Sequence, residues 1–372
     1  MENLSDLFRT DPDTLSGRYM RSFWHPVYVA EDLKPGWAKP VRIMSENFTL
    51  YRGETGTPHL VAFRCAHRGM QLSAGWIEGD QIRCRFHGWK YDGTGQCVEI
   101  PTEDAATAKT TRIRSYPVRE HLGLIFAYLG EGEAPDFPRY PDFEEGGELW
   151  VETYTRACNF VNNMENDPVH IPFAHRESEL FHNRPIEIPS SVQAEESDWG
   201  IIIRSTFANG WVHINQRGWP NMTCFKSPRQ QHRSHLTWRV PIDDDHHWSF
   251  QVDLMYPTAD LERANRYRQR HAARTGKLGR SYIELGEAVL RGELRIQDID
   301  GDDRYNLIWI QDYVTQVGQG PLSERKSERL IRADIGLLLY RSIWTRELGA
   351  LSQNKRTKKW IRTKAIMASE DE

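Results

Sequence analysis

The sequence contains no run of apolar residues long enough to cross a lipid bilayer. Its longest apolar runs, residues 122–129 and 337–340, are far shorter than the roughly 20 residues that a membrane-spanning helix needs. The first six residues are acidic, and the apolar core of a secretory signal is absent there. We therefore expect a cytoplasmic protein without a membrane anchor.

The chain is also poor in cysteine and has no large excess of either charge. Five cysteines in 372 residues do not indicate a disulfide-stabilised protein. The 48 Lys and Arg residues are balanced by 52 Asp and Glu residues, so the composition does not predict a nucleic-acid-binding protein. No GxGxxG loop follows a predicted strand, and we do not expect the chain to bind NAD(P)H itself.

The apolar content is sufficient for more than one core. At about 150 residues per domain, 372 residues predict two or three domains. Strand-like runs separated by turn signals occupy most of the first third, and three prolines within residues 134–141 indicate a stiff linker. The predicted parts are a lead-in at 1–22, a β-rich domain at 23–135, a second domain of strands and helices at 136–350, and a charged tail at 351–372.

Two cysteine–histidine pairs are the strongest chemical signal in the sequence. Cys65 and His67 form a C-x-H pattern, and Cys84 and His87 form a C-x-x-H pattern after sixteen intervening residues. Each pair lies beside predicted hairpin strands, so two loops can converge on one metal site. Four such donors could bind zinc, but zinc fingers pair Cys with Cys and His with His. One Cys and one His per loop suits a two-iron cluster with thiolates on one iron and imidazoles on the other.

A second group of metal-binding side chains lies in residues 159–176. His170 and His175 would be about 140° apart on a regular helix, but Pro172 between them disturbs that regularity and could let both rings turn toward one point. Two His and a distant carboxylate form the facial triad of non-haem Fe(II) oxygenases. The spacing does not select the carboxylate. The candidates are Asp298, Asp300, Asp302, Asp303 and Asp312.

These motifs resemble those of the Rieske non-haem iron oxygenases. Residues 65–69 and 84–91 are similar to the family's [2Fe–2S] motif and lack the extra cysteine that respiratory Rieske proteins carry in each loop. The segment from Glu165 to His175 resembles the family's iron-binding stretch, although Asn166 here directly precedes Asp167, without the two residues that usually separate them. Residues 311–334 look like the phthalate-dioxygenase-like group, in which Gln-Asp stands ahead of Gly-Pro and a long helix.

The resemblance spans residues 20–345 and implies the cofactors and their ligands. In the family, an Asp at the position of Asp167 bridges the His ligands of two metal centres in neighbouring subunits of a homotrimer. The residues themselves also suggest a simpler role, in which Asp167 is the N-cap of a helix that begins at Pro168. The implied ligands are Cys65, His67, Cys84 and His87 for one [2Fe–2S] cluster, and His170, His175 and Asp312 for one mononuclear Fe(II).

The resemblance also implies the fold and the activity. We expect an α+β protein with an N-terminal all-β Rieske domain and a C-terminal helix-grip domain, in which an antiparallel sheet wraps around a long helix. It would be the terminal oxygenase component of a multicomponent system, with electrons supplied from NAD(P)H by a separate reductase or ferredoxin. We expect O₂-dependent monooxygenation of an aromatic compound, including O- or N-dealkylation. The alternatives are cis-dihydroxylation of the ring and, in a different class, an electron carrier without oxygenase activity.

The residues that contact the substrate are harder to predict. Trp211, His213, Asn215 and Phe225 lie on alternating segments that could line a pocket, although an ordinary half-buried strand has the same pattern. The arginine-rich segment 263–280 could bind substrate carboxylates, but a solvated helix face is the simpler explanation.

Overall fold

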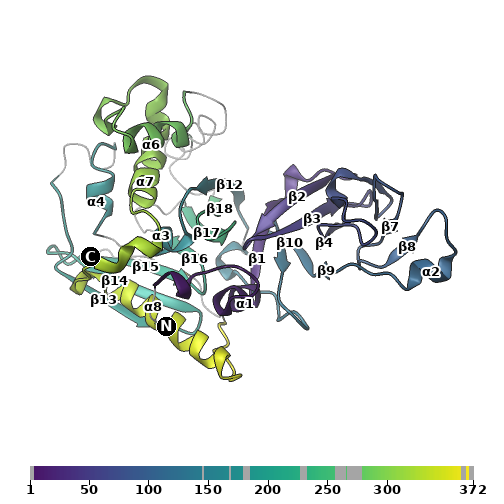
Figure 1. Ribbon diagram of the computed structural model, residues 1–372. Coiled ribbons are helices and arrows are strands. Elements are labelled where there is room, and N and C mark those ends of the chain that lie inside the picture. Colours follow the sequence, from purple (N-terminus) through teal and green to yellow (C-terminus); the bar gives the residue numbers. More distant parts are fainter. Residues whose placement is uncertain are drawn as a thin grey trace.

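A computed structural model describes residues 4–144, 146–166, 169–178, 185–226, 233–255, 265, 279–361 and 366–367. The chain forms two lobes that lie side by side (Figure 1). The N-terminal lobe runs from β1 to β11 and is built from small β-sheets, whereas the C-terminal lobe, from β12 to α8, combines one large sheet with helices. The predicted α+β class, with a β-rich first domain and an antiparallel sheet and helices in the second, is confirmed.

Three antiparallel sheets form the N-terminal lobe, and its innermost strand is β11 (Leu124–Tyr128). All five residues of β11 are buried, as expected for an apolar run between two partner strands. The first sheet contains β1 (Trp24–Val29), β11 and β10 (Val118–His121). The second contains β2 (Ala38–Ile43), β3 (Glu46–Arg52), β4 (Pro58–Ala62) and β9 (Ser115–Tyr116). The third contains β5 (Trp76–Glu78), β6 (Gln81–Arg83), β7 (Lys90–Tyr91) and β8 (Cys97–Glu99), followed by α2 (Ala105–Lys109).

The C-terminal lobe is built on a seven-stranded antiparallel sheet. In spatial order its strands are β12 (Glu148–Arg156), β18 (His247–Met255), β17 (Arg233–Pro241), β16 (Met222–Lys226), β15 (Val212–Gly218), β14 (Gly200–Thr206) and β13 (Ser191–Glu196). Each strand pairs with the next along the chain except at β12, which returns to the edge beside β18.

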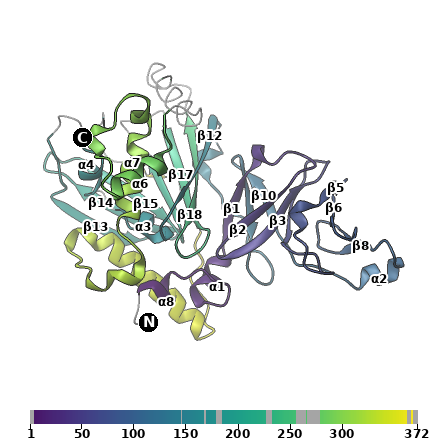
Figure 2. The same cartoon turned by 45° about the horizontal axis from the view of Figure 1, so that its top comes forward.

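Helices cover one side of this sheet (Figure 2). α7 packs near β12, α3 near β17 and α8 near β13 and β14. The α-helices whose bounds lie within the described residues of the C-terminal lobe are α3 (Phe160–Met164), α4 (Ile171–Ala174), α6 (Tyr282–Leu290), α7 (Leu307–Val317) and α8 (Ile335–Ser352). Short 3₁₀ turns are η1 (Leu4–Leu7), η2 (Ala30–Asp32), η3 (Leu72–Ala74), η4 (Pro141–Phe143), η6 (Ile296–Asp298), η7 (Gly301–Asn306), η8 (Leu322–Ser327) and η9 (Arg332–Asp334). Within the described part of the chain, no helix has the length and apolarity needed to span a membrane.

Both ends of the described chain pack on the C-terminal lobe. The N-terminal helix α1 (Leu15–Arg21) contacts α8, and the Tyr19 ring lies 5.4 Å from that of Trp344. At the other end, Trp360 stacks on Trp219 at 4.9 Å, and Lys358 pairs with Glu196 at 2.7 Å. Residues 15–21 and 358–360 therefore belong to the packing of this lobe.

The two lobes share one apolar core. The outer face of the large sheet, opposite the helices, carries Trp238 and Trp248. Phe126 of β11 lies 5.4 Å from Trp238, and Tyr28 of β1 lies 6.1 Å from Trp248, both edge to face. These ring contacts fix the N-terminal lobe against the back of the sheet, so the helix-covered face remains available for a site.

Candidate functional site

The loops that carry the two cysteine–histidine pairs have the same backbone geometry. In the first loop, the Cys65 amide donates to Met70 O at 2.8 Å, and the Gly69 amide donates to Cys65 O at 3.0 Å. In the second, the Cys84 amide donates to Trp89 O at 2.8 Å, and the Gly88 amide donates to Cys84 O at 3.0 Å. Gly69 and Gly88 have φ of +71° and +75°, a conformation that residues with a Cβ rarely adopt.

An arginine supports each loop in the same way. Arg64 and Arg83 directly precede the two cysteines, and each donates from Nη1 to a carbonyl five residues further on, Gly69 O or Gly88 O, at 2.8 Å. Arg83 also pairs with Glu78 at 2.8 Å and with Glu99 at 2.9 Å. The two loops are therefore held as a matched pair, which the sequence spacing alone did not reveal.

The four donor side chains come together at the tips of these loops. Cys65 and Cys84 are buried, and burial raises the pKa of the Cys84 thiol, with a further rise from Cys65 beside it. His67 and His87 are exposed, and their ring centroids lie 4.5 Å apart. The thiols thus form an inner pair and the imidazoles an outer pair. This donor set fits a two-iron cluster better than a single zinc ion, which needs four donors around one point.

Neighbouring side chains restrain both pairs. Tyr91 Oη lies 3.2 Å from Cys65 Sγ and accepts from the Ala66 amide at 3.2 Å. The Trp89 indole stacks on the His67 ring at 4.8 Å, with the two planes only 3° apart. One thiol and one imidazole are therefore held in place by contacts within the protein.

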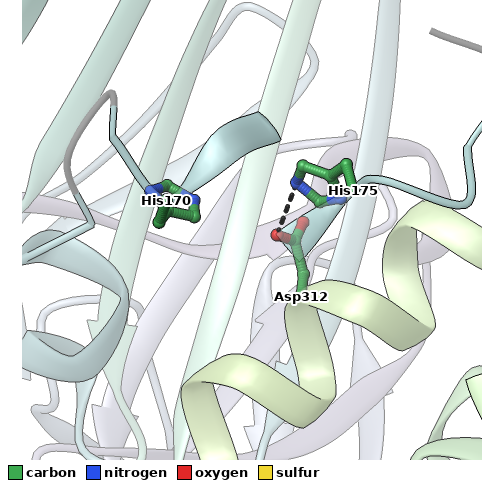
Figure 3. Close-up of side chains that lie close together, drawn as sticks. All are labelled: His170, His175 and Asp312. Atoms are coloured by element: carbon green, nitrogen blue, oxygen red, sulfur yellow. Dashed lines mark ion pairs between the residues drawn. The ribbon is translucent and has the colours of Figure 1, made fainter. Parts of the chain in front are cut away.

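A second cluster lies in the C-terminal lobe, where His170, His175 and Asp312 converge (Figure 3). One possible ligand atom from each lies within 4.8 Å of the others, and His175 Nε2 is 3.4 Å from Asp312 Oδ1. His170 precedes α4 and His175 follows it, so this four-residue helix with Pro172 brings both rings to one side. Asp312 comes from α7, far along the chain.

The charge state of this cluster suits a cation. Burial acts to raise the pKa of Asp312, but its hydrogen bond with His175 and the positive charge of Arg156 hold that pKa below its usual value. Burial acts to lower the pKa of His175, but the hydrogen bond with Asp312 and the charge of that carboxylate outweigh burial, so the pKa of His175 is raised. An ionised carboxylate beside two imidazoles is the donor set that Fe(II) accepts in facial-triad sites, so these residues fit the metal.

Gln311 fixes the orientation of the His175 ring. Its Oε1 accepts a hydrogen bond from His175 Nδ1 at 3.2 Å, and its Nε2 donates to Glu177 Oε2 at 3.0 Å. With Nδ1 engaged as a donor, Nε2 is the nitrogen that faces Asp312 and is free to bind a metal. The sequence contained one signal for this role, because Gln311 directly precedes Asp312, whereas its full burial is seen only in the structure.

The other carboxylates that the sequence offered lie elsewhere. Asp298 pairs with Arg295 at 2.6 Å and Asp303 with Arg280 at 2.8 Å, while Asp300 and Asp302 are exposed. Among the described residues, Asp312 is the acidic residue that joins the two His in a metal-sized group.

Asp167 lies outside the described residues, as does most of the segment 263–280. The chain just before Asp167 is firmly held. Glu165 is buried and pairs with Arg325 at 3.0 Å and with Arg341 at 2.6 Å. The next residue, Asn166, accepts a hydrogen bond at its carbonyl from Arg217.

The residues considered for a substrate pocket form a row of rings. Trp211 lies 5.6 Å from His213, which lies 5.6 Å from Phe225. His213 is buried, and burial lowers its pKa to about 4. Asn215 follows on the same side of β15 because side chains alternate along a strand.

Comparison with known proteins identifies a family with this architecture. The Rieske [2Fe-2S] domain family matches residues 23–117. The chain is 29% identical to the 5,5'-dehydrodivanillate O-demethylase oxygenase subunit of a Sphingobium strain, over 98% of this chain and 84% of that protein. It is 30% identical to the phenoxybenzoate dioxygenase subunit alpha of Ectopseudomonas oleovorans, over 91% and 83%. The terminal oxygenase of carbazole 1,9a-dioxygenase from Nocardioides aromaticivorans superposes with a TM-score of 0.66 at 19% identity, covering 92% of this chain and 96% of that one.

The fold and the relatives together define an iron-dependent oxygenase. More specifically, the chain belongs to the Rieske non-haem iron oxygenases and is an oxygenase subunit of that family. Members carry a Rieske [2Fe–2S] cluster and a mononuclear catalytic iron, so the predicted family, enzyme class and cofactors are confirmed.

The contact between Gln311 and His175 generates a first prediction. In the variant Gln311→Leu, the His175 ring loses its hydrogen-bond acceptor, and we expect affinity for Fe(II) at the second cluster to fall by about 10- to 100-fold. Competition with a chromophoric chelator measures this affinity. Gln297→Leu, a change at an exposed glutamine, is the matched control. Equal Fe(II) affinities for wild type and Gln311→Leu would show that His175 needs no such support.

Proposed function

We propose that the two clusters are the metal sites of this oxygenase. The support for the first is the matched pair of loops, and for the second the convergence of two imidazoles and an ionised carboxylate. The proposed ligands are Cys65, His67, Cys84 and His87 for the [2Fe–2S] cluster, and His170, His175 and Asp312 for Fe(II).

Each protein group around the iron site has a defined task. When bound, Fe(II) at a facial triad supplies coordination positions at which O₂ can be bound and reduced. Gln311 holds the His175 ring in the tautomer that presents Nε2, and Arg156 keeps the carboxylate of Asp312 ionised.

The reaction that we propose is the hydroxylation of an aromatic substrate, including oxidative removal of an O- or N-alkyl group. The O-demethylase relative, which matches 98% of this chain, supports this direction. A dioxygenase among the relatives keeps cis-dihydroxylation of the ring as the second candidate. The single observation that carries this proposal is that ligand atoms of His170, His175 and Asp312 lie close together.

We further propose a separate electron donor, a ferredoxin or an NAD(P)H-dependent reductase. His67 and His87 are exposed, so a donor can approach the outer edge of the cluster. Solved relatives include a complex of an oxygenase with its ferredoxin. We place the system in the cytoplasm, where NAD(P)H is available.

A homotrimer is the assembly that we propose. The loops of the first cluster lie at one end of the subunit, whereas α4 and α7 lie at the other (Figures 1 and 2). The two sites of one chain therefore lie at opposite ends of the folded subunit. For this reason, the first cluster would serve the iron site of a neighbouring subunit. In this assembly Asp167 would connect the two sites across the interface. We propose domain limits of 23–135 and 136–350.

Iron counting tests the assignment of Asp312. We expect about three iron atoms and two acid-labile sulfides per chain in the wild type. Asp312→Ala should lower the iron count toward two and leave the visible spectrum of the cluster unchanged, because it removes only a ligand of the mononuclear site. Asp300→Ala, at an exposed carboxylate, should keep the full count. Three iron atoms in Asp312→Ala would mean that another residue supplies the carboxylate.

A substrate panel tests the reaction. With a surrogate reductase and NADH, methoxylated and unsubstituted aromatic compounds should support O₂ uptake, and the products are scored as formaldehyde, phenols or diols. We expect formaldehyde from a methoxyarene. Diols alone would favour the dihydroxylase, and no coupled uptake from an iron-replete enzyme would argue for an electron carrier.

The role of Asp167 can be tested with a nearly isosteric change. Asn caps a helix about as well as Asp, so a mere N-cap would tolerate Asp167→Asn. A bridge between two imidazole N–H groups needs the carboxylate, and its loss should lower turnover by roughly 100-fold while the cluster and most of the iron are retained. Stopped-flow re-oxidation of the reduced cluster with O₂ and substrate is the direct readout. Re-oxidation at the wild-type rate would assign Asp167 to helix capping.

A further inference from the structure

Four aromatic rings gather where α7 packs against β12 and α6. The ring centroid of Trp309, on α7, lies 4.3 Å from that of Tyr154 on β12 and 5.6 Å from that of Tyr282 on α6. The Tyr282 ring in turn lies 6.2 Å from that of Tyr313, the next aromatic residue along α7. The indole of Trp and the phenol of Tyr lose one electron more readily than most other side chains. None of the four rings belongs to the proposed set of iron ligands.

The ring group begins next to the iron ligand that α7 supplies. Trp309 is three residues before Asp312, and residues three apart are neighbours on the surface of a helix. Tyr313 directly follows Asp312 and is buried against α6, where a Cβ on Gly286 would lie 2.4 Å from its ring. The iron site and the ring group are therefore joined within about one turn of α7.

A buried guanidinium lies among the four rings and affects which of them can remain oxidised. Cζ of Arg156 is 4.4 Å from the ring centroid of Tyr154 and 4.9 Å from that of Tyr282. It is 5.7 Å from the rings of Trp309 and Tyr313. A ring that loses only an electron becomes a cation, and a positive charge this close opposes that state. A ring that also loses a proton stays neutral and avoids the repulsion.

Tyr313 has the proton acceptor that a neutral oxidised ring needs. Its hydroxyl donates to Glu287 Oε1 at 2.5 Å, a length typical of a hydrogen bond to an ionised carboxylate. The side chain of Glu287 is 38% exposed and lies 3.6 Å from Arg291, so a proton on Glu287 can exchange with water. The Tyr282 hydroxyl donates instead to the backbone carbonyl of Thr155 at 3.0 Å, which is too weak a base to accept a proton.

We propose that Trp309, Tyr282 and Tyr313 form an electron relay that reduces the oxidant of the iron site when no substrate consumes it. The inference rests on the proposed function, which places the reduction of O₂ beside Asp312. The electron leaves Tyr313 and passes through Tyr282 and Trp309 to the oxidant, and the phenolic proton passes to Glu287. A neutral tyrosyl radical remains until an electron from the enzyme's donor and the proton on Glu287 restore the phenol. The relay protects the ligand side chains from oxidation.

Hydrogen peroxide is the probe that tests this relay without an electron donor. It is at the oxidation level of O₂ that has accepted two electrons and two protons. One molecule of peroxide takes one electron from Fe(II), one electron from Tyr313 and two protons from solvent, and becomes two molecules of water. The iron becomes Fe(III), Tyr313 becomes a neutral radical, and the phenolic proton is held by Glu287.

Electron paramagnetic resonance of the rapidly frozen holoenzyme detects the radical. The cluster is kept oxidised, in which state it gives no signal. We expect a tyrosyl signal that narrows when ring-deuterated tyrosine is incorporated, and its loss in Tyr313→Phe. Glu287→Gln should lower the yield at least about tenfold, because an amide accepts the hydrogen bond but does not take up the proton. Tyr305→Phe, at a tyrosine that is 51% exposed, is the matched control and should keep the signal.

Mass spectrometry of the same samples measures the protection. In Tyr313→Phe the oxidant stays at the iron site, so oxygen addition to the peptides that contain His170 and His175 should exceed that in the wild type. Equal damage in the two proteins would mean that Tyr313 serves only in packing. A tyrosyl signal of unchanged intensity in Tyr313→Phe would also overturn the relay.

The variant Asp312→Ala separates failure of the relay from failure of the proposed function. It should give no radical, because it lacks a ligand of the mononuclear iron. An equal radical yield in Asp312→Ala, or no consumption of peroxide by the fully iron-loaded wild type, would count against the proposed iron site. Consumption of peroxide by the wild type without a tyrosyl signal would count against the relay alone.

Discussion

The contact of Arg156 with helix α7 is the interaction on which the iron site depends. Its guanidinium lies at the end of β12, 4.4 Å from the Tyr154 ring and 5.7 Å from that of Trp309, and its Nε donates to Gln316 Oε1 at 3.2 Å. Gln316 is one helical turn beyond Asp312, so this hydrogen bond sets the rotation of α7 on the sheet. The same rotation directs Asp312 toward the two His and Gln311 toward His175. A single buried cation therefore both positions the carboxylate and favours its ionised form.

The two proposed metal centres are organised by different means. The loops of the N-terminal lobe are short and local, and each is closed by its own backbone hydrogen bonds and its own arginine. The second centre is assembled from α4 and α7, which are more than a hundred residues apart in the chain, and it depends on the large sheet to bring them together. Local closure suits a compact cofactor that must remain at the surface, whereas assembly across a sheet combines side chains from distant parts of the chain.

This difference explains what the sequence could predict. The sequence alone predicts Cys65, His67, Cys84 and His87 as one set of ligands because all four lie in two short loops, where spacing reflects geometry. Residue spacing left Asp312 as one of five acidic candidates, and the resemblance to a family selected it. The roles of Gln311 and Glu177 were not predicted, because they depend on contacts between elements far apart in the chain.

The shared core has a consequence for recombining parts of related enzymes. A second, separate core lies around the cluster loops and includes Tyr51, Leu72, Ile82 and Tyr91. The strands β1 and β11 belong instead to the core of the C-terminal lobe, although they lie within or beside the segment that the Rieske domain family matches. The boundary between the two hydrophobic cores therefore lies within the N-terminal domain and does not coincide with the linker. A chimera that exchanges only the part between β4 and β9 leaves the shared core intact and divides the second core only at β3 and β4, whereas one cut at the linker places Phe126 and Trp238 in parts of different origin.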